Sequence, residues 1–311
     1  MSNWMQTPET ILRRLEWTVL RRLDGVLHGD YRTLFRGPGV DLADLREYQY
    51  HDDVRHIDWN VTARLQVPHV RVFNEDRDLT AWFLLDLSPS VDFGSGQVKK
   101  RGVEIDLVTI LASMLTHHGN RIGALFYGGD VDTVIPERTG RRQVLHILRR
   151  MLDRPEASQA APTRLQDLLQ TAFQVIRRRS LVFVVSDFIS MPGWAKPLAQ
   201  LAQRHEVVAV RLYDKLEMEL PDLGVLVVQD AETGEQLFVD THDRLFRRRF
   251  AAAAARREES LRSAFRDAGV DALELATSDS IMDAVLRFAE LRKVRQRLAA
   301  GGTMPRHVEQ S

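Results

Sequence analysis

The sequence predicts an α/β fold with a doubly wound, mostly parallel sheet, helices on both faces and a small amino-terminal subdomain. Two observations lead to this class. From residue 79 onward, apolar runs of strand length alternate with helical stretches, which is the pattern of a parallel sheet covered by helices on both faces. The chain has 311 residues, of which 44% are hydrophobic, enough for a substantial buried core.

The first element is an amphipathic helix over residues 8–27. Thr7 is placed to cap it and Pro8 suits its first turn. Its apolar residues recur at helical spacing and are Leu12, Leu15, Val19, Leu23 and Val26. Arginines occupy its other faces. A packed helix with a solvated basic side is favoured over a membrane-surface or partner-binding helix.

The pattern changes twice more along the chain. Short charged and aromatic pieces over residues 37–78 indicate loops and short strands within an amino-terminal subdomain, residues 1–78. Residues 79–298 form the predicted main domain, and residues 299–311 a flexible tail. Within the main domain, strands are expected at 81–85, 121–127, 181–186 and 207–213, and helices at 98–118, 141–152, 164–177 and 194–204.

The remaining elements complete the sheet and its cover. Residues 131–135 are expected to form a short antiparallel strand, and residues 225–228 and 236–239 a hairpin on the edge of the sheet. A long helix over 242–268, a strand over 270–275 and a helix over 280–298 follow.

Composition excludes several classes of function. The chain has no cysteine, which rules out disulfide scaffolds, thiolate metal sites and cysteine nucleophiles. Its 43 Lys and Arg residues balance 43 Asp and Glu residues, which argues against a protein that coats nucleic acid. The first residues do not resemble a secretory signal, and the longest apolar stretches are too short for a membrane span. A cytoplasmic protein is therefore expected.

Polar residues gather where predicted strands end. The first buried strand ends in LLDLSPS, which places Asp86, Ser88 and Ser90 where the chain leaves the sheet, and the run LVFVVSDF ends in the same way with Asp187. If these strands flank the point where strand order reverses, Asp86 and Asp187 face one another. Thr163 belongs on a loop at the start of a helix. Two carboxylates and three hydroxyls would then converge.

Such an all-oxygen set suits a hard divalent cation, Mg²⁺ or Mn²⁺. Two carboxylates neutralise the ion, and uncharged hydroxyls leave it electrophilic, with a position open for an acidic group from elsewhere. The alternative is structural: Asp86 and Ser88 cap a helix or build a turn, and Thr163 is an ordinary N-cap.

These residues resemble the metal-ion-dependent adhesion site of von Willebrand factor type A domains. Over residues 37–293 the chain is similar to the family catalogued as domain of unknown function 58, through the segments REYQYHDDVRHIDWNVTAR, VRVFNEDRDLTAWFLLDLSPSVDFG and ELPDLGVLVVQDAETGEQLFVDT. The resemblance implies a von Willebrand type A fold and a MoxR-type AAA+ ATPase as partner. Adhesion domains often have Gly after their second metal Asp, whereas Phe188 stands here. Since Gly allows backbone angles that Phe does not, an altered loop is expected.

Other candidate sites are weaker. The potential ligands His51, Asp52, Asp53, His56 and Asp58 are interleaved with arginines, which favours ion pairs that hold the subdomain against the sheet, with Tyr48 and Trp59 packing nearby. The segment GSGQVKK does not have P-loop spacing, and neither a Gly-x-Ser-x-Gly elbow nor His-Glu-x-x-His occurs.

The sequence therefore predicts a binding adaptor and not an enzyme. The expected ion, Mg²⁺ or Mn²⁺, would recruit an acidic side chain of an unknown client or partner protein, while a MoxR-type AAA+ ATPase supplies work. Direct nucleic-acid binding is not expected. The alternative is a metal-dependent phosphohydrolase that uses the strand-end metal or the cluster from His51 to Asp58.

Overall fold

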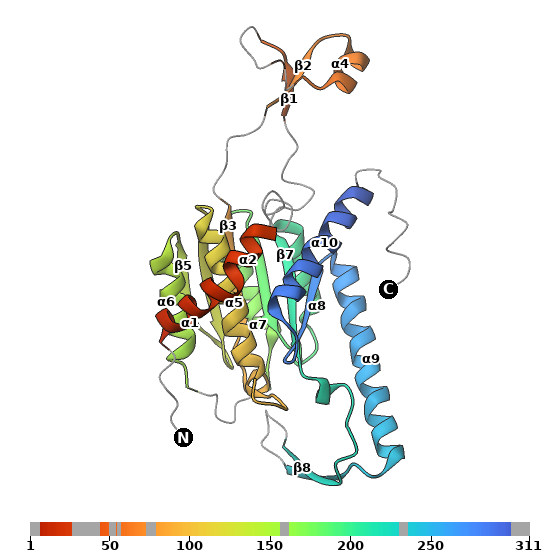
Figure 1. Ribbon diagram of the computed structural model, residues 1–311. Coiled ribbons are helices and arrows are strands. Elements are labelled where there is room, and N and C mark those ends of the chain that lie inside the picture. The colour runs from red at the N-terminus through yellow and green to blue at the C-terminus, as the bar shows by residue number, and fades with distance from the viewer. Residues whose placement is uncertain are drawn as a thin grey trace.

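The main architecture is a six-stranded sheet between two layers of helices (Figure 1). The structure is a computed structural model that describes residues 7–26, 44–49, 54, 57–72, 79–155, 162–229 and 236–299. The strand order is β10-β7-β6-β3-β4-β5. Its strands are β3 (Thr80–Asp86), β4 (Arg121–Tyr127), β5 (Val131–Arg138), β6 (Leu181–Ser186), β7 (Glu206–Tyr213) and β10 (Asp271–Ala276). Only β5 runs antiparallel, as predicted, and the α/β fold class is confirmed.

Both faces of the sheet are buried at the central strands β3, β4, β6 and β7, which explains why these strands are largely apolar on both faces. In β3, Phe83 and Leu85 join a core cluster on one face, while Trp82 and Leu84 join a cluster on the other. The first cluster is covered by α5 (Lys100–His117), α6 (Arg141–Leu152), α10 (Ile281–Ala299) and the amino-terminal helix. The second is covered by α7 (Leu165–Val175), α8 (Ala195–Arg204) and α9 (Arg244–Ala268).

The strand order reverses beside β3. From β3 the chain moves outward through β4 and β5, then returns to place β6 on the opposite side of β3 before continuing through β7 and β10. In a doubly wound sheet, the carboxyl ends of the strands at such a reversal border a crevice in which ligands bind. The carboxyl ends of β3 and β6 are therefore the expected place for a site.

The amino-terminal helix packs on the core, as predicted. It consists of α1 (Pro8–Leu15), a π-helical turn η1 (Glu16–Leu20) and α2 (Arg21–Val26). The Thr7 side chain caps it by accepting a hydrogen bond from the Thr10 backbone N–H. Ile11, Leu12 and Leu15 are buried in the core cluster that also contains the apolar side of α5. The π-helical turn was not predicted from the sequence.

Residues 44–72 contain short elements, as expected. Strands β1 (Asp44–Glu47) and β2 (His69–Val72) pair in antiparallel fashion, and the helix α4 (Trp59–Leu65) lies between them in sequence. Trp59 was expected to pack, but its side chain is 69% exposed. The expectation was wrong because Trp59 is the first residue of a seven-residue helix that has no buried residue.

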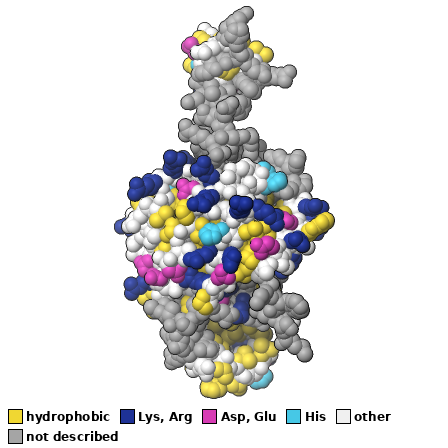
Figure 2. Space-filling model, turned by 90° about the vertical axis from the view of Figure 1, so that its left-hand side faces the viewer, with side chains coloured by type: hydrophobic (Ala, Val, Ile, Leu, Met, Phe, Trp, Pro, Cys, Tyr) yellow, Lys and Arg dark blue, Asp and Glu magenta, His cyan; other side chains and the backbone are white. Residues whose placement is uncertain are grey.

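The predicted hairpin forms from β8 (Val225–Gln229) and β9 (Gln236–Asp240), but it is not on the edge of the main sheet. The two strands form a sheet of their own, because β10 and β5 already occupy the two edge positions. Val225, Leu237 and Phe238 are 67%, 63% and 74% exposed, respectively. Figure 2 shows hydrophobic side chains gathered at this lower end of the molecule.

Across the described ranges, no helix combines the length and the apolar character that crossing a membrane requires.

Candidate functional site

Asp86 and the two serines lie together at the carboxyl end of β3. Asp86 is the last residue of the strand and is fully buried. Its Oδ1 accepts a hydrogen bond of 3.1 Å from the Ser88 backbone N–H, and its Oδ2 accepts one of 2.6 Å from the Ser186 hydroxyl. Ser88 precedes a short 3-10 turn, η3 (Pro89–Asp92), which turns the Ser90 hydroxyl back to within 3.2 Å of the Ser88 hydroxyl.

Asp187 meets Asp86 across the reversal of strand order. It follows β6, the strand that pairs with β3, and its side chain is also buried. Burial and then the negative charge of Asp187 raise the pKa of Asp86 to about 6. Because Asp86 ends β3 and Asp187 follows the neighbouring strand β6, the two carboxylates lie near one another, as the strand-end argument predicts.

Thr163 is buried beside the loop that follows Asp187. Its carbonyl oxygen accepts a hydrogen bond of 2.9 Å from the Ser190 hydroxyl and another of 2.9 Å from the Met191 backbone N–H. The N-cap residue of α7 is Arg164, so Thr163 is not the N-cap of that helix. The structure therefore brings the loop of Thr163 against the loop of Asp187.

Phe188 holds this second loop in an uncommon conformation. Its φ is 57°, in the left-handed region that favours glycine. The resemblance to adhesion sites predicted that the loop would differ where Phe188 replaces Gly. Phe188 instead adopts the left-handed backbone angle that Gly would allow. The ring is buried and packs against Phe265, with centroids 4.9 Å apart, and against Trp194 at 5.4 Å. Aromatic packing thus offsets the backbone strain and fixes the direction of Asp187.

Lys100 is a member of the site that sequence reasoning missed. Its side chain is fully buried, and its ammonium lies 2.7 Å from Asp187 Oδ2 and 2.6 Å from Glu217 Oε1. Burial lowers the pKa of Lys100, but the two carboxylates outweigh that effect and the pKa lies above its ordinary value. The ammonium is therefore charged and bridges two carboxylates. Glu217 belongs to a second 3-10 turn, η4 (Lys215–Glu217), which follows β7.

Glu104 lies one helical turn beyond Lys100 and is also fully buried. Neither of its carboxylate oxygens has a hydrogen-bond partner among the described residues. Burial and then the charge of Asp86 raise the pKa of Glu104 well above its usual range, with a smaller contribution from Asp187. No local sequence signal marks these two side chains as inward-facing, because they stand among other charged residues at the start of α5, Lys99, Arg101 and Asp106.

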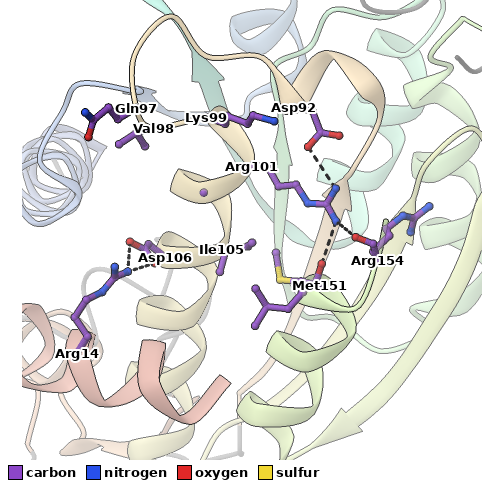
Figure 3. A pocket seen from close by; sticks show the side chains of 12 residues that line it. Arg14, Asp92, Gln97, Val98, Lys99, Arg101, Ile105, Asp106, Met151 and Arg154 are labelled. Atoms are coloured by element: carbon purple, nitrogen blue, oxygen red, sulfur yellow. Dashed lines mark hydrogen bonds and ion pairs between the residues drawn. The ribbon is translucent and has the colours of Figure 1, made fainter. Parts of the chain in front are cut away.

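A pocket of about 540 Å³ lies on the outer side of the first turns of α5 (Figure 3). Lys99 and Arg101 line it, whereas Lys100 and Glu104 do not. Arg101 closes one side by donating to Asp92, to Met151 O at 3.1 Å and to Arg154 O at 2.6 Å. The pocket is therefore separate from the strand-end residues.

The second sequence candidate falls mostly outside the described residues, which include neither His51, Asp52 and Asp53 nor His56. Asp58 is described and has a structural role, because its Oδ1 caps α4 by accepting from the backbone N–H groups of Asn60 and Val61. Within the described ranges, no group of three or more His, Cys, Asp or Glu side chains is arranged to hold a metal ion. A cation site in this part of the chain therefore needs hydroxyl ligands as well.

The strand-end residues fit a small divalent cation. Two neighbouring ligands of an octahedral Mg²⁺ or Mn²⁺ shell, at about 2.1 Å from the ion, lie roughly 3.0 Å apart. The hydroxyl oxygens of Ser88 and Ser90 are separated by 3.2 Å, close to that spacing. Lys100 pairs with Asp187 and Glu217, while no positive charge of the described residues clearly acts on the buried Asp86 carboxylate. The donor set and its excess negative charge suit a hard cation.

The chain is similar to proteins whose function is not established. The family model described as "Protein of unknown function DUF58" matches residues 44–260. The uncharacterized protein Rv1480 of Mycobacterium tuberculosis (strain ATCC 25618 / H37Rv) is 38% identical over 284 residues, which cover 91% of this chain and 89% of that protein. The uncharacterized protein Mb1516 of Mycobacterium bovis (strain ATCC BAA-935 / AF2122/97) matches with the same identity and coverage.

Solved structures with a similar architecture have low sequence identity. The conserved hypothetical protein BatB from Bacteroides thetaiotaomicron is 14% identical with a TM-score of 0.45, over 69% of this chain and 98% of that chain. The VWA domain of SpRpn10 is 12% identical with a TM-score of 0.39, over 67% of this chain and 94% of that chain.

Proposed function

This chain belongs to the DUF58 family of proteins of unknown function, and from that premise we propose that it is a metal-dependent protein-binding adaptor. A divalent cation, Mg²⁺ or Mn²⁺, would be held by Asp86, Ser88, Ser90, Thr163 and Asp187, directly or through water. The partner protein would supply an acidic side chain to the remaining position. The client is a protein that is assembled or remodelled.

One observation carries this proposal. Asp86 and Asp187 are buried together at the reversal of strand order, and the hydroxyls of Ser88 and Ser90 lie 3.2 Å apart beside them. Burying two carboxylates side by side is unfavourable unless a proton or a cation compensates their charge. A doubly wound fold places such a pair where a ligand can reach it.

Each side chain would have a distinct role in the proposed metal site. Asp86 and Asp187 supply negative charge, and the serine hydroxyls supply weak neutral oxygen ligands that leave the cation electrophilic. When bound, the cation offers a Lewis-acidic position to a carboxylate of another protein. Phe188 and Ser186 orient the two aspartates, since Ser186 donates to Asp86 and accepts from the Phe188 backbone N–H.

The resemblance to the domain of unknown function 58 suggests a MoxR-type AAA+ ATPase as partner. Because the sequence has no P-loop, ATP hydrolysis would be contributed by that partner. The adaptor would then transmit the work of the ATPase to the client. This assignment rests on family analogy.

Metal binding is tested with Asp86→Ala. Titration calorimetry with Mn²⁺ should show one site in the wild-type protein and none in Asp86→Ala. Asp130→Ala, which removes an exposed aspartate in the turn after β4, is the matched control and should bind as the wild type does. Absence of Mn²⁺ binding both by the wild-type protein and by Lys100→Met, which lacks the neighbouring ammonium, would refute the metal site.

The partner is tested by co-purification. A MoxR-type ATPase should be retained by the wild-type protein, released by a chelator and not retained by Asp86→Ala. The phosphohydrolase alternative predicts a different result, namely metal-dependent hydrolysis of phosphoesters by the pure protein that Asp86→Ala or Asp58→Ala abolishes. Such turnover would overturn the adaptor proposal.

A further inference from the structure

We propose that Lys100 is a built-in cation that competes with the divalent ion for Asp187 and so weakens metal binding at this site. The inference rests on the proposed metal site and concerns its regulation. It assigns a role to two residues outside the predicted ligand set, Lys100 and Glu217.

The ammonium occupies the position that a metal ligand needs. Asp187 Oδ1 already accepts a hydrogen bond of 2.9 Å from the Ile189 backbone N–H, and Oδ2 lies 2.7 Å from Lys100 Nζ. Both oxygens are therefore engaged. A cation that approaches Asp187 meets the positive charge of Lys100 at short range, within a buried environment where salt screens little.

Lys100 has a second carboxylate partner, Glu217, with which it can remain paired when it leaves Asp187. Its ammonium also lies 2.6 Å from Glu217 Oε1. Glu217 is itself held in place, because its Oε2 accepts a hydrogen bond of 3.0 Å from the Asp214 backbone N–H and its carbonyl oxygen accepts one of 3.1 Å from Arg257. Lys100 can therefore release Asp187 and stay paired, and neither charge is left alone.

Two further buried carboxyl groups, Asp86 and Glu104, lie beside this ion pair. Glu104 is fully buried, has no hydrogen-bond partner for either oxygen among the described residues, and interacts electrostatically with Asp86 and Asp187. Lys100 is paired with Asp187 and Glu217, so the negative charge of Asp86 is left for another cation to compensate. The site can thus accept a further cation at the cost of displacing Lys100 from Asp187.

The competition predicts effects of opposite sign for two substitutions. Lys100→Met removes the ammonium but keeps a side chain of similar length, so the Mn²⁺ dissociation constant should fall at least tenfold. Glu217→Gln removes the charge of the second carboxylate partner, and among the described residues it leaves Asp187 as the only carboxylate paired with the ammonium, so the dissociation constant should rise at least threefold. An ion pair that does not compete for Asp187 predicts at most the small long-range effect of charge that the control variants measure.

Two control variants distinguish direct competition for Asp187 from the long-range effect of removing a nearby charge. Lys99→Met removes an exposed lysine next in sequence, and Asp92→Asn removes a nearby carboxylate that pairs with Arg101. Both should leave the dissociation constant within about twofold of the wild-type value. The Lys100→Met effect should persist when NaCl is raised from about 0.1 M to 0.5 M, because buried charges are weakly screened.

The experiment is Mn²⁺ titration calorimetry on the full chain and these four variants. Binding by Lys100→Met alone also supports the inference, since it means that the ammonium excludes the ion completely. Equal dissociation constants for the wild type and Lys100→Met overturn the inference while the proposed metal site stands. If Lys100→Met does not fold, an unchanged constant in Glu217→Gln overturns it. No binding by any variant overturns the metal site and the inference together.

Discussion

Replacing Asp86 with Asn should stabilise the metal-free protein at neutral pH. The pKa of Asp86 is about 6 in the folded protein, against an ordinary value of 3.8. An acid whose pKa is raised on folding binds more protons when folded, so stability falls as pH rises from about 4 to about 6 and stays low above that range. The rise in pKa from 3.8 to about 6 corresponds to about 3 kcal/mol at pH 7.5.

The expected gain is smaller than this electrostatic cost. Asp86 accepts hydrogen bonds from Ser88 and Ser186, and an Asn side chain retains one acceptor oxygen. Losing one of these bonds costs about 1 kcal/mol, which leaves a net gain of about 2 kcal/mol at pH 7.5. At pH 4 the Asp86 carboxyl is protonated in the folded state, so the gain should disappear.

Urea unfolding in EDTA measures both values. With a denaturant slope of about 2 kcal/mol per molar, the midpoint of Asp86→Asn should exceed that of the wild type by about 1 M at pH 7.5. Asp130→Asn, at an exposed position, should change stability by less than about 0.5 kcal/mol. Saturating Mn²⁺ should stabilise only the protein that retains Asp86. A stability difference between Asp86→Asn and wild type that is the same at pH 4 and pH 7.5 would refute the reasoning.

Three further predictions concern stability and are measured by the same unfolding assay. Glu258→Leu leaves Arg211 buried without its bidentate partner and should cost about 3 to 5 kcal/mol, whereas the double variant with Arg211→Met should recover most of that loss; equal losses would contradict the pairing. Burial lowers the pKa of His205 to about 4, so the wild type should lose up to about 3 kcal/mol as pH falls from 6.5 to 4, and His205→Leu should show a smaller loss over that range. Phe188→Ala and Phe188→Gly both lose the aromatic packing, but Gly should be the more stable by about 1 kcal/mol because φ at this position is 57°; the reverse order would argue against the strain.

Much of the fold was predictable from the sequence because the main strands are apolar on both faces. The predicted bounds of β4 and β6 match the observed ones, and β3 is one residue longer at each end. The meeting of Asp86 with Asp187 was also predictable, since both follow strands at the reversal of strand order. The position of the β8–β9 hairpin was not predictable, because strand propensity does not indicate which strands form the edges of the main sheet.

The charged part of the site was not predictable from local pattern. Lys100 follows Lys99 at a helix start, where lysines are commonly solvated, and only the three-dimensional packing of α5 turns Lys100 inward and Lys99 outward. Glu217 lies 117 residues further along the chain, where it forms a capping box with Asp214, a motif that predicts a helical turn but not a contact with Lys100. The contact between Lys100 and Glu217 depends on how α5 packs against the end of β7, which the local sequence of neither segment predicts.

The loop at Phe188 has a practical consequence for motif searches. A search pattern written as Asp followed by Gly passes over this chain, even though the backbone after Asp187 has the left-handed angle that such a Gly would supply. Packing of the Phe188 ring on Trp194 and Phe265 stabilises this backbone angle, which glycine would adopt without strain. Sequences with an aromatic residue at this position and a tryptophan six residues later are therefore candidates for the same loop, and a profile that accepts both solutions would find them.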